Sequence, residues 1–451
     1  MKIVNFVLPI LIALAYAPAE AWANTPLLGG DLNGVSVFAG TSSAPAAPHG
    51  ATISVGDSAT VYGSLLSIGV LETNAGARIT GNVVAGGAAN IGAIIGTVTT
   101  PVLSVGGYVL SGGVLTTGDG AIVIGSVNSS GAGTIGANAT VGGNMISGGV
   151  ATASANSRVN GSLLSVGAAS IGDTAMVGQN MVSRGLATTG ANSKVQGTVT
   201  GSSLSISASS FVLERVFTTP ALAPAVTNDV IALAQDGARQ VLNAQTALTM
   251  MANSTGAKMG TDSLGSVITS HLAATMTVNT TLYAGVFSAA SWSTTAGTTL
   301  LLDNQGKDNQ SWVFNIADIL AFGGTTKIKV VGAGKGDIVL WNVGNGYASL
   351  GDGADVIGTI LAKTYIMVGA NAIVTGVGNS CGGVFSQTSY VSTGANSIVG
   401  GSGCTGVNTG FEIASNGVAG RAAAVPEPAS YGMLLAGLGL LGFMARRKKQ
   451  A

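Results

Sequence analysis

Residues 136–189 decide the fold, because they read GANATVGGNMISGGVATA, SANSRVNGSLLSVGAASI and GDTAMVGQNMVSRGLATT in succession. Each of the three segments has 18 residues, and equivalent positions carry similar side chains. Further copies begin at Gly56, Asn74, Gly118 and Gly190, and the copy from Gly92 carries eight additional residues. A fixed short period of this kind is typical of an array of stacked repeats.

Aligning the copies places apolar side chains in columns 18 residues apart. One column is Val61, Ile79, Val123, Val141, Val159, Val177 and Val195. Four residues later come Leu65, Val83, Val127, Met145, Leu163, Met181 and Val199, and a third column, from Gly69 to Gly185, is glycine throughout. Eighteen residues are too few for two crossing helices, and glycine is a poor helix former. The sequence therefore predicts a β-solenoid of three short strands per coil. Glycine is expected where a corner needs a positive φ or a close backbone approach.

One column that should point outward carries hydroxyl groups. Its members, which we call the hydroxyl row, are Thr116, Thr134, Thr152, Ser170 and Thr188. Side chains alternate along a strand, so hydroxyls and methyl groups should repeat about every 4.8 Å along a flat face. Threonine is also a good strand former, so β-propensity alone is the alternative explanation. A second outward column, from Thr60 to Lys194, includes Arg78 and Arg158 and is typical of a solvated face.

Composition excludes several classes of function. Only 8% of the 451 residues are charged, and 18 basic residues balance 18 acidic ones, so no electrostatic field attracts nucleic acid. The chain has two histidines, and its closest carboxylates, Asp352 and Asp355, lie in a segment with turn chemistry. The sequence therefore predicts a protein that is not an enzyme and has no catalytic residues, metal site or cofactor.

Both ends of the chain look like targeting signals. A lysine, an apolar run and Ala21-Trp22-Ala23 predict a secretory signal peptide over residues 1–23. At the other end, Pro426, Glu427 and Pro428 precede an apolar run over residues 431–445 and a basic cluster. The segment 425–451 resembles the PEP-CTERM sorting signal of Gram-negative bacteria. A plain membrane anchor is the alternative, although fifteen apolar residues are few for a bilayer.

The PEP-CTERM resemblance implies where the protein is found. It implies processing by an exosortase, transient anchoring in the inner membrane through a short transmembrane helix at 431–445, and then secretion or attachment at the cell surface. Its usual setting includes an exopolysaccharide, so surface polysaccharide is one expected partner. In that oxidising compartment Cys381 and Cys404 are candidates for a structural disulfide.

The pattern changes near residue 216. Apolar residues from Ile231 to Met251 recur at helical spacing after a capping segment at 226–229, which predicts a helix ending near Ala252. Gly237 within it should allow close packing on the solenoid. Strand-like segments then return, and the 18-residue pattern reappears at Gly351. We therefore divide the chain into N-terminal coils (24–215), linker and helix (216–256), C-terminal coils (257–410) and a second linker (411–424).

The second half resembles the ice-binding-like (antifreeze) family of microbial β-solenoid proteins. The matching phrases are residues 282–287, 300–306, 312–314, 340–344 and 358–362, with 28–29 and 35–40 near the start. The resemblance implies an all-β-dominated, right-handed β-helix with one long α-helix packed alongside. It also implies binding of ice, or ordered water, through a flat Thr/Ser-rich face, for which the hydroxyl row is the candidate. The alternative is a structural or adhesive protein of an exopolysaccharide matrix without ice activity.

Overall fold

The computed structural model describes most of the chain between residues 28 and 419. The described residues are 28–41, 51–93, 104–221, 229–254, 280–334, 336–377, 381–406, 412–414 and 417–419. The predicted signal peptide (1–23) and sorting segment (425–451), with Pro426, Glu427 and Pro428, lie outside them.

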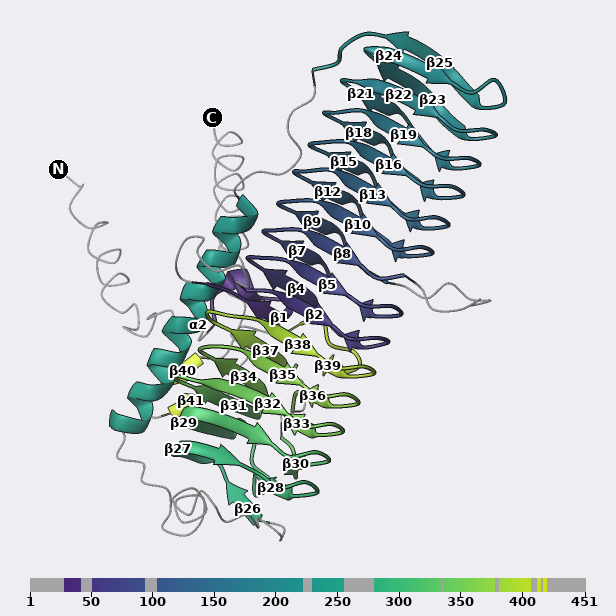
Figure 1. Cartoon of the computed structure of the whole chain (residues 1–451). Helices are drawn as coiled ribbons and strands as arrows, with labels where there is room; N and C mark the ends of the chain where they lie inside the picture. The colour runs from purple at the N-terminus through teal and green to yellow at the C-terminus, as the bar shows by residue number, and fades with distance from the viewer. Residues whose placement is uncertain are drawn as a thin grey trace, which may run out of the picture.

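Strands on three faces build one β-solenoid rod (Figure 1). From the lower end upward, face A consists of β26 (Thr280–Tyr283), β28 (Thr299–Asp303), β30 (Lys327–Val331), β33 (Asp355–Ile357), β36 (Ile373–Thr375), β39 (Ile398–Gly400), β3 (Thr60–Val61), β6 (Arg78–Ile79), β11 (Ile122–Val123), β14 (Thr140–Val141), β17 (Arg158–Val159) and β20 (Met176–Val177). The bent strands β23 (Lys194–Gly201) and β25 (Phe211–Phe217) begin on face A and end on face B.

Face B follows face A in every coil. Its strands are β27 (Gly285–Ser293), β29 (Ser311–Phe322), β31 (Ile338–Val343), β34 (Thr359–Ala362), β37 (Gly383–Ser386), β1 (Val35–Ala39), β4 (Ser64–Ser67), β7 (Val83–Ala85), β9 (Val109–Ser111), β12 (Val127–Ser129), β15 (Met145–Ser147), β18 (Leu163–Ser165) and β21 (Met181–Ser183). The long strands β27 and β29 continue onto face C.

Face C completes the triangle. Its strands are β32 (Tyr347–Leu350), β35 (Ile366–Val368), β38 (Val391–Thr393), β2 (Ile53–Val55), β5 (Leu71–Thr73), β8 (Ala89–Ile91), β10 (Leu115–Thr117), β13 (Gly133–Ile135), β16 (Ala151–Ala153), β19 (Ala169–Ile171), β22 (Leu186–Thr189) and β24 (Ser203–Ile206). Besides the rod, the chain forms a short helix η1 (Gly30–Leu32), the long helix α2 (Asp229–Ser254) and a small hairpin of β40 (Glu412–Ala414) and β41 (Gly417–Ala419).

Neighbouring coils pair in parallel, with direct partners 18 residues apart from β9 to β23 and 26 apart across the longer coil between β7 and β9. Val141 pairs with Val159 on face A, and Val159 pairs with Val177. On face B, Met145 and Leu163 pair in the same way. All of these side chains are fully buried in one continuous core. The apolar columns seen in the sequence are therefore stacked directly over one another.

The two halves of the solenoid join at a seam in the middle of the rod. There β1 lies between β37 and β4, β2 between β38 and β5, and β3 between β39 and β6. The chain thus starts at mid-length, climbs through the upper coils to β25, returns along α2, and climbs through the lower coils back to β1 (Figure 1). The sequence analysis did not predict this order.

Helix α2 covers the lower part of face B, as the amphipathic pattern predicted. Its buried residues Ala234, Ala238, Val241 and Leu248 share a hydrophobic cluster with outward side chains of the sheet, Phe38, Leu66, Val84, Leu361 and Phe385. A Cβ on Gly237 would lie 2.8 Å from the ring of Phe38, so the glycine permits the close approach. Gln245 Nε2 also donates a hydrogen bond to the carbonyl of Val343 (2.9 Å).

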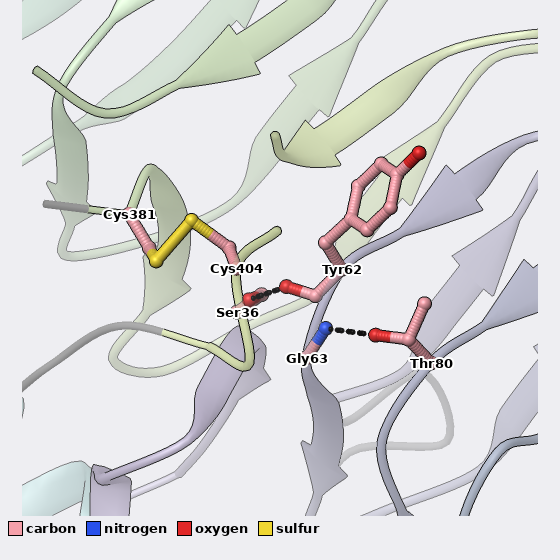
Figure 2. Close-up of a disulfide and its surroundings, with 6 residues drawn as sticks. All are labelled: Ser36, Tyr62, Gly63, Thr80, Cys381 and Cys404. Atoms are coloured by element: carbon pink, nitrogen blue, oxygen red, sulfur yellow. Dashed lines mark hydrogen bonds between the residues drawn. A yellow bond between two sulfur atoms is a disulfide. The ribbon is translucent and has the colours of Figure 1, made fainter. Parts of the chain in front are cut away.

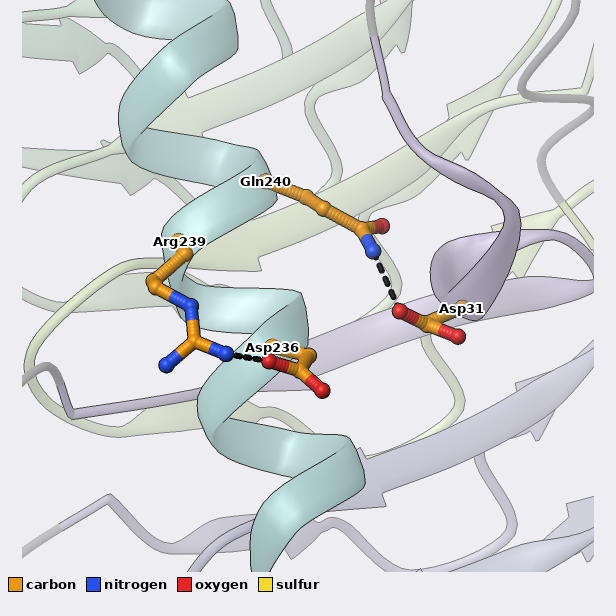
Figure 3. Close-up of polar contacts among 4 residues, drawn as sticks. All are labelled: Asp31, Asp236, Arg239 and Gln240. Atoms are coloured by element: carbon orange, nitrogen blue, oxygen red, sulfur yellow. Dashed lines mark hydrogen bonds and ion pairs between the residues drawn. The ribbon is translucent and has the colours of Figure 1, made fainter.

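Polar contacts fix the outer edge of the same helix (Figure 3). Gln240 Nε2 donates to the Asp31 carboxylate on η1, and Arg239 pairs with Asp236 one turn earlier in the helix. The Arg239–Asp236 pair is exposed, so it contributes little to stability. The contact with Asp31 instead links α2 to η1, which directly precedes β1, one of the strands at the seam.

Two different physical requirements act at the corners of the coils. At the corner between faces C and A the backbone is left-handed, with φ of 57° at Asn138, 58° at Asn156 and 57° at Asn192, and other coils place Ser58, Gly76, Gly120 or Thr174 there. The glycine column instead serves close stacking of corners. A Cβ on Gly131 would lie 3.0 Å from the carbonyl oxygen of Gly113 in the coil below. Close backbone approach, rather than positive φ, therefore explains that glycine column.

A disulfide lies in the coil directly below the seam, where it joins the segment before β37 to the segment after β39. Cys381 and Cys404 are bonded to each other, with Cα atoms 5.7 Å apart (Figure 2). Nearby, Ser36 Oγ donates to the carbonyl of Tyr62 (2.5 Å), and the Gly63 amide donates to Thr80 Oγ1 (2.9 Å). The first bond connects β1 to the coil above it, and the second joins that coil to the next one. A covalent link therefore lies below the seam and polar links lie at and above it.

Candidate functional site

The five hydroxyl side chains predicted from the sequence lie side by side on face C. Thr116 pairs with Thr134, Thr134 with Thr152, Thr152 with Ser170, and Ser170 with Thr188. Each is the outward residue of its strand and is half-buried between two buried neighbours. Ser170 Oγ also donates to Thr152 Oγ1 (3.4 Å). The structure thus brings all five into one row along the rod.

The same register continues beyond the row in both directions. Above Thr188 comes Ser205, whereas below Thr116 come Asn90 and Glu72, joined by a 3.4 Å hydrogen bond. Below the seam the equivalent positions are Ser392, Met367 and Ser349. An unbroken series of threonine and serine therefore occurs only on the upper coils.

A second column lies beside the hydroxyl row, two residues earlier in each coil. We call it the alternating column, because valine or leucine alternates with alanine at Val70, Ala88, Val114, Ala132, Val150, Ala168 and Leu186. Backbone hydrogen bonds place these residues over one another, such as Leu115 N–H to the Ala132 carbonyl (2.9 Å) and Gly133 N–H to the Val150 carbonyl (2.8 Å). The sequence analysis missed this column, although its 18-residue spacing was visible there.

The alternating column places large and small side chains in regular succession along face C. Val114, Val150 and Leu186 are 48%, 46% and 43% exposed, although they are large apolar side chains. The alanines between them leave shallow hollows. Since strands stack at about 4.8 Å, protruding side chains recur about every 9.6 Å next to the hydroxyl row. From β10 to β22, face C therefore combines methyl groups and hydroxyls without charge.

The other two faces lack this regularity. On face A the outward column is Thr60, Arg78, Ile122, Thr140, Arg158, Met176 and Lys194, which mixes charged, apolar and polar groups as expected. Face B is covered by α2 on the lower coils, and on the upper coils its outward column continues with Asn128, Ile146, Leu164 and Val182, which carry no hydroxyl group. From β10 to β22, face C is the face that is uncharged and carries a repeated hydroxyl group.

The two carboxylates nearest to each other in the sequence, those of Asp352 and Asp355, take part in a corner and a strand of the coils. Within the described residues, no group of three or more His, Cys, Asp or Glu residues could hold a metal ion, and both histidines lie outside the described ranges. Asp352 Oδ1 accepts a hydrogen bond from the Ala370 amide (2.8 Å). This bond joins the corners of two neighbouring coils. Burial raises the pKa of Asp355, while Lys327 and Lys329 oppose that rise. This carboxyl lies on face A, beneath Ile373.

Fold and surface together define a repetitive β-solenoid that carries an uncharged hydroxyl row on face C. Comparison with family models gives the same class. The chain matches the ice-binding-like family over residues 181–417, more than half its length, and therefore belongs to that family. Residues 424–448 match the PEP-CTERM protein-sorting motif.

Two solved structures are among those similar to the chain. One is an ice-binding protein from the Antarctic ascomycete Antarctomyces psychrotrophicus, at 18% identity, with 49% of this chain and 92% of that chain covered and a TM-score of 0.23. The other is an ice-binding protein from an Antarctic bacterium of the Flavobacteriaceae, at 15% identity, with 84% and 99% covered and a TM-score of 0.27. No curated protein matches the chain.

Proposed function

We propose that the protein is a secreted or surface-attached, non-catalytic protein that binds ice through face C of its upper coils. The observation that carries this proposal is the hydroxyl row, which runs beside the alternating column in register with the strand ladder. Membership of the ice-binding-like family supports it.

Ice offers a regular lattice of neutral water molecules that donate and accept hydrogen bonds, so its binding site must be rigid and regular rather than reactive. The strand ladder holds each coil at about 4.8 Å from the next. Threonine is stiff at χ1, so its hydroxyl and methyl groups keep fixed directions. The methyl groups of the alternating column add apolar surface, and ordered water can remain between these groups. Face C therefore presents to water a pattern that is already fixed before contact with ice.

Thermal hysteresis of the purified protein tests this proposal, with Thr152→Tyr as the key variant and Thr140→Tyr as its matched control. Thr152 lies on face C and Thr140 on face A of the same coil. A tyrosine side chain projects further from the face than the neighbouring Thr134 and Ser170, so Thr152→Tyr should hold ice away from the hydroxyl groups above and below it. We expect hysteresis and ice shaping from the unaltered protein and from Thr140→Tyr, and loss of more than half of the hysteresis in Thr152→Tyr. Ice that grows normally with the unaltered protein, or an equal loss in both variants, contradicts the proposal.

The second candidate is a structural or adhesive role in a surface polysaccharide matrix. It is favoured by the PEP-CTERM motif, which indicates a secreted or cell-surface protein of Gram-negative bacteria. Normal ice growth together with retention of the protein in the extracellular matrix would favour this role over ice binding.

Processing of the C-terminus belongs to the same proposal. Among the described residues no helix is long and apolar enough to cross a membrane, and the segment 431–445 is not among them. We propose transient inner-membrane anchoring through this segment and exosortase cleavage near Pro426–Pro428. Mass spectrometry of the mature C-terminus checks it, because a chain ending at Ala451 in the extracellular fraction would contradict cleavage.

A further inference from the structure

Three tyrosines form a stacked ladder on the lower coils. Tyr347, Tyr365 and Tyr390 have ring centroids 4.5 and 5.0 Å apart and ring planes within 11° and 3° of parallel. They belong to β32 and to the residues just before β35 and β38, at the corner between faces B and C. All three are half-buried, so their ring edges reach the solvent. We call these residues the tyrosine ladder.

The solenoid fold does not require aromatic residues at these positions. Going up the rod, the same column continues with Thr52 and then becomes the alternating column of Val70 and Ala88. Those coils stack with the same parallel pairing although they carry small aliphatic residues there. The tyrosine rings are also outside the buried core cluster of the rod. Aromatic rings are therefore not needed at this column to hold adjacent coils together.

The surroundings of the ladder are polar and differ from the hydroxyl row above the seam. Ser349 and Ser392 lie beside Tyr347 and Tyr390 on face C, and Met367, 39% exposed, lies between them. Lys363 is exposed two residues before Tyr365. A lysine and a protruding methionine interrupt any flat lattice of hydroxyls. This surface therefore does not extend the proposed ice-binding face.

The ladder presents a row of neutral groups that can both donate and accept hydrogen bonds. A phenol hydroxyl has one donor and acceptor lone pairs. Burial, the neighbouring phenol groups of Tyr347 and Tyr390, and a side-chain hydrogen bond with Tyr347 raise the pKa of Tyr365, so this hydroxyl is protonated at neutral pH. The ring edges add apolar contact area to each hydroxyl. The rungs repeat about every 4.8 Å, which is close to the length of one pyranose ring in an extended glycan.

We propose that the tyrosine ladder binds an extended neutral glycan whose sugar rings follow one another along the rod. Each sugar would meet one rung, with its hydroxyls bonded to a phenol oxygen and to the serine hydroxyls beside it. Its C–H groups would lie against the ring edges. Lys363 donates a further hydrogen bond to a sugar oxygen. The site is on the lower coils, so it does not depend on whether the upper coils bind ice.

Affinity electrophoresis of the full-length protein in gels containing hydroxyethyl cellulose or galactomannan tests the proposal. We expect one of these neutral polymers to retard the protein. Tyr365→Phe keeps the stacked ring but removes one hydroxyl, so it should weaken binding about threefold to tenfold, the effect of one neutral hydrogen bond. The triple variant Tyr347→Phe, Tyr365→Phe, Tyr390→Phe should abolish retardation with an unchanged melting temperature, since the stack is preserved.

Controls separate this site from the proposed ice-binding face. Thr134→Val with Thr152→Val should leave glycan retardation unchanged, whatever it does to thermal hysteresis. The proposal is overturned if neither neutral polymer retards the protein, or if the triple phenylalanine variant binds as tightly as the unaltered protein. It is also overturned if acidic alginate binds more tightly than both neutral polymers, because the ligand would then be recognised by charge.

Discussion

Replacing Phe38 by alanine should destabilise the protein strongly, because this ring lies where the seam and the helix meet. Phe38 is fully buried, its ring centroid is 6.4 Å from that of Phe385, and it packs against Gly237 and Ala238 of α2. Burying a phenylalanine removes about 150–200 Å² from water, which at about 25 cal/mol per Å² is about 4–5 kcal/mol. The retained Cβ and a compact unfolded chain lower this to about 3–4 kcal/mol.

The matched control is Leu164→Ala, which changes the same outward column of face B on the upper coils. Leu164 is half-buried and pairs with Ile146 and Val182, outside the cluster that α2 covers. Its loss should cost about 1 kcal/mol, since the side chain is only partly removed from water. Guanidinium denaturation at 25 °C measures both costs, and hydrogen exchange of the α2 amides should accelerate only in Phe38→Ala. Equal costs in the two variants, or unchanged exchange of α2 in Phe38→Ala, would refute this account of how the helix is held.

Three further predictions concern the corners, the disulfide and the tyrosine ladder. Asn156 has φ of 58°. Asn156→Ala should therefore lower the free energy of unfolding, measured in urea, by about 1 kcal/mol, whereas Asn156→Gly should change it little. Equal effects of the two substitutions would contradict a left-handed backbone at this corner. Replacing both Cys381 and Cys404 by serine should cost about 3 kcal/mol, because the bond closes a loop of 23 residues, and reductant should destabilise the unaltered protein but not the variant. The pKa of Tyr365 is raised above its ordinary value of 10.0, so the folded state holds this proton more tightly than the unfolded chain. Its contribution to stability is therefore present below pH 10 and lost as pH rises through the folded pKa. Ultraviolet titration should show one phenol ionising late, and Tyr365→Phe should remove that late phase.

Local repetition made most of the upper half predictable. The valine column at Val141, Val159 and Val177 gave the core, and the threonines of the hydroxyl row gave the outward face, because each copy lies directly over the next. The helix was predictable from its apolar spacing and from Gly237, which does permit close packing against Phe38. The positions of the hydroxyl residues are thus known, whereas their binding of ice is a proposal that only the assay can test.

Features without a simple period were missed for physical reasons. The pairing of Val37 with Val384 joins distant segments, and neither sequence carries a signal for the other. The tyrosine ladder was hidden because extra residues between Tyr365 and Tyr390 break the 18-residue spacing that relates Tyr347 to Tyr365. Corner asparagines were overlooked because the glycine column alone was considered for left-handed backbone. Periodicity therefore identifies stacking within one half but cannot show how two halves meet.

The seam also determines when folding of the solenoid can be completed. The Gly56 amide donates to Thr393 Oγ1 across a separation of 337 residues, so strand β2 leaves the translocation pore long before its lower partner exists. Until then β1 and β2 expose a hydrophobic strand edge, which is the kind of edge that pairs with other chains. Forming a contact between residues so distant in the sequence is slow compared with pairing one coil with the next. A protein built in this order needs its open middle shielded during secretion, and the last coils to be synthesised are the ones that seal it.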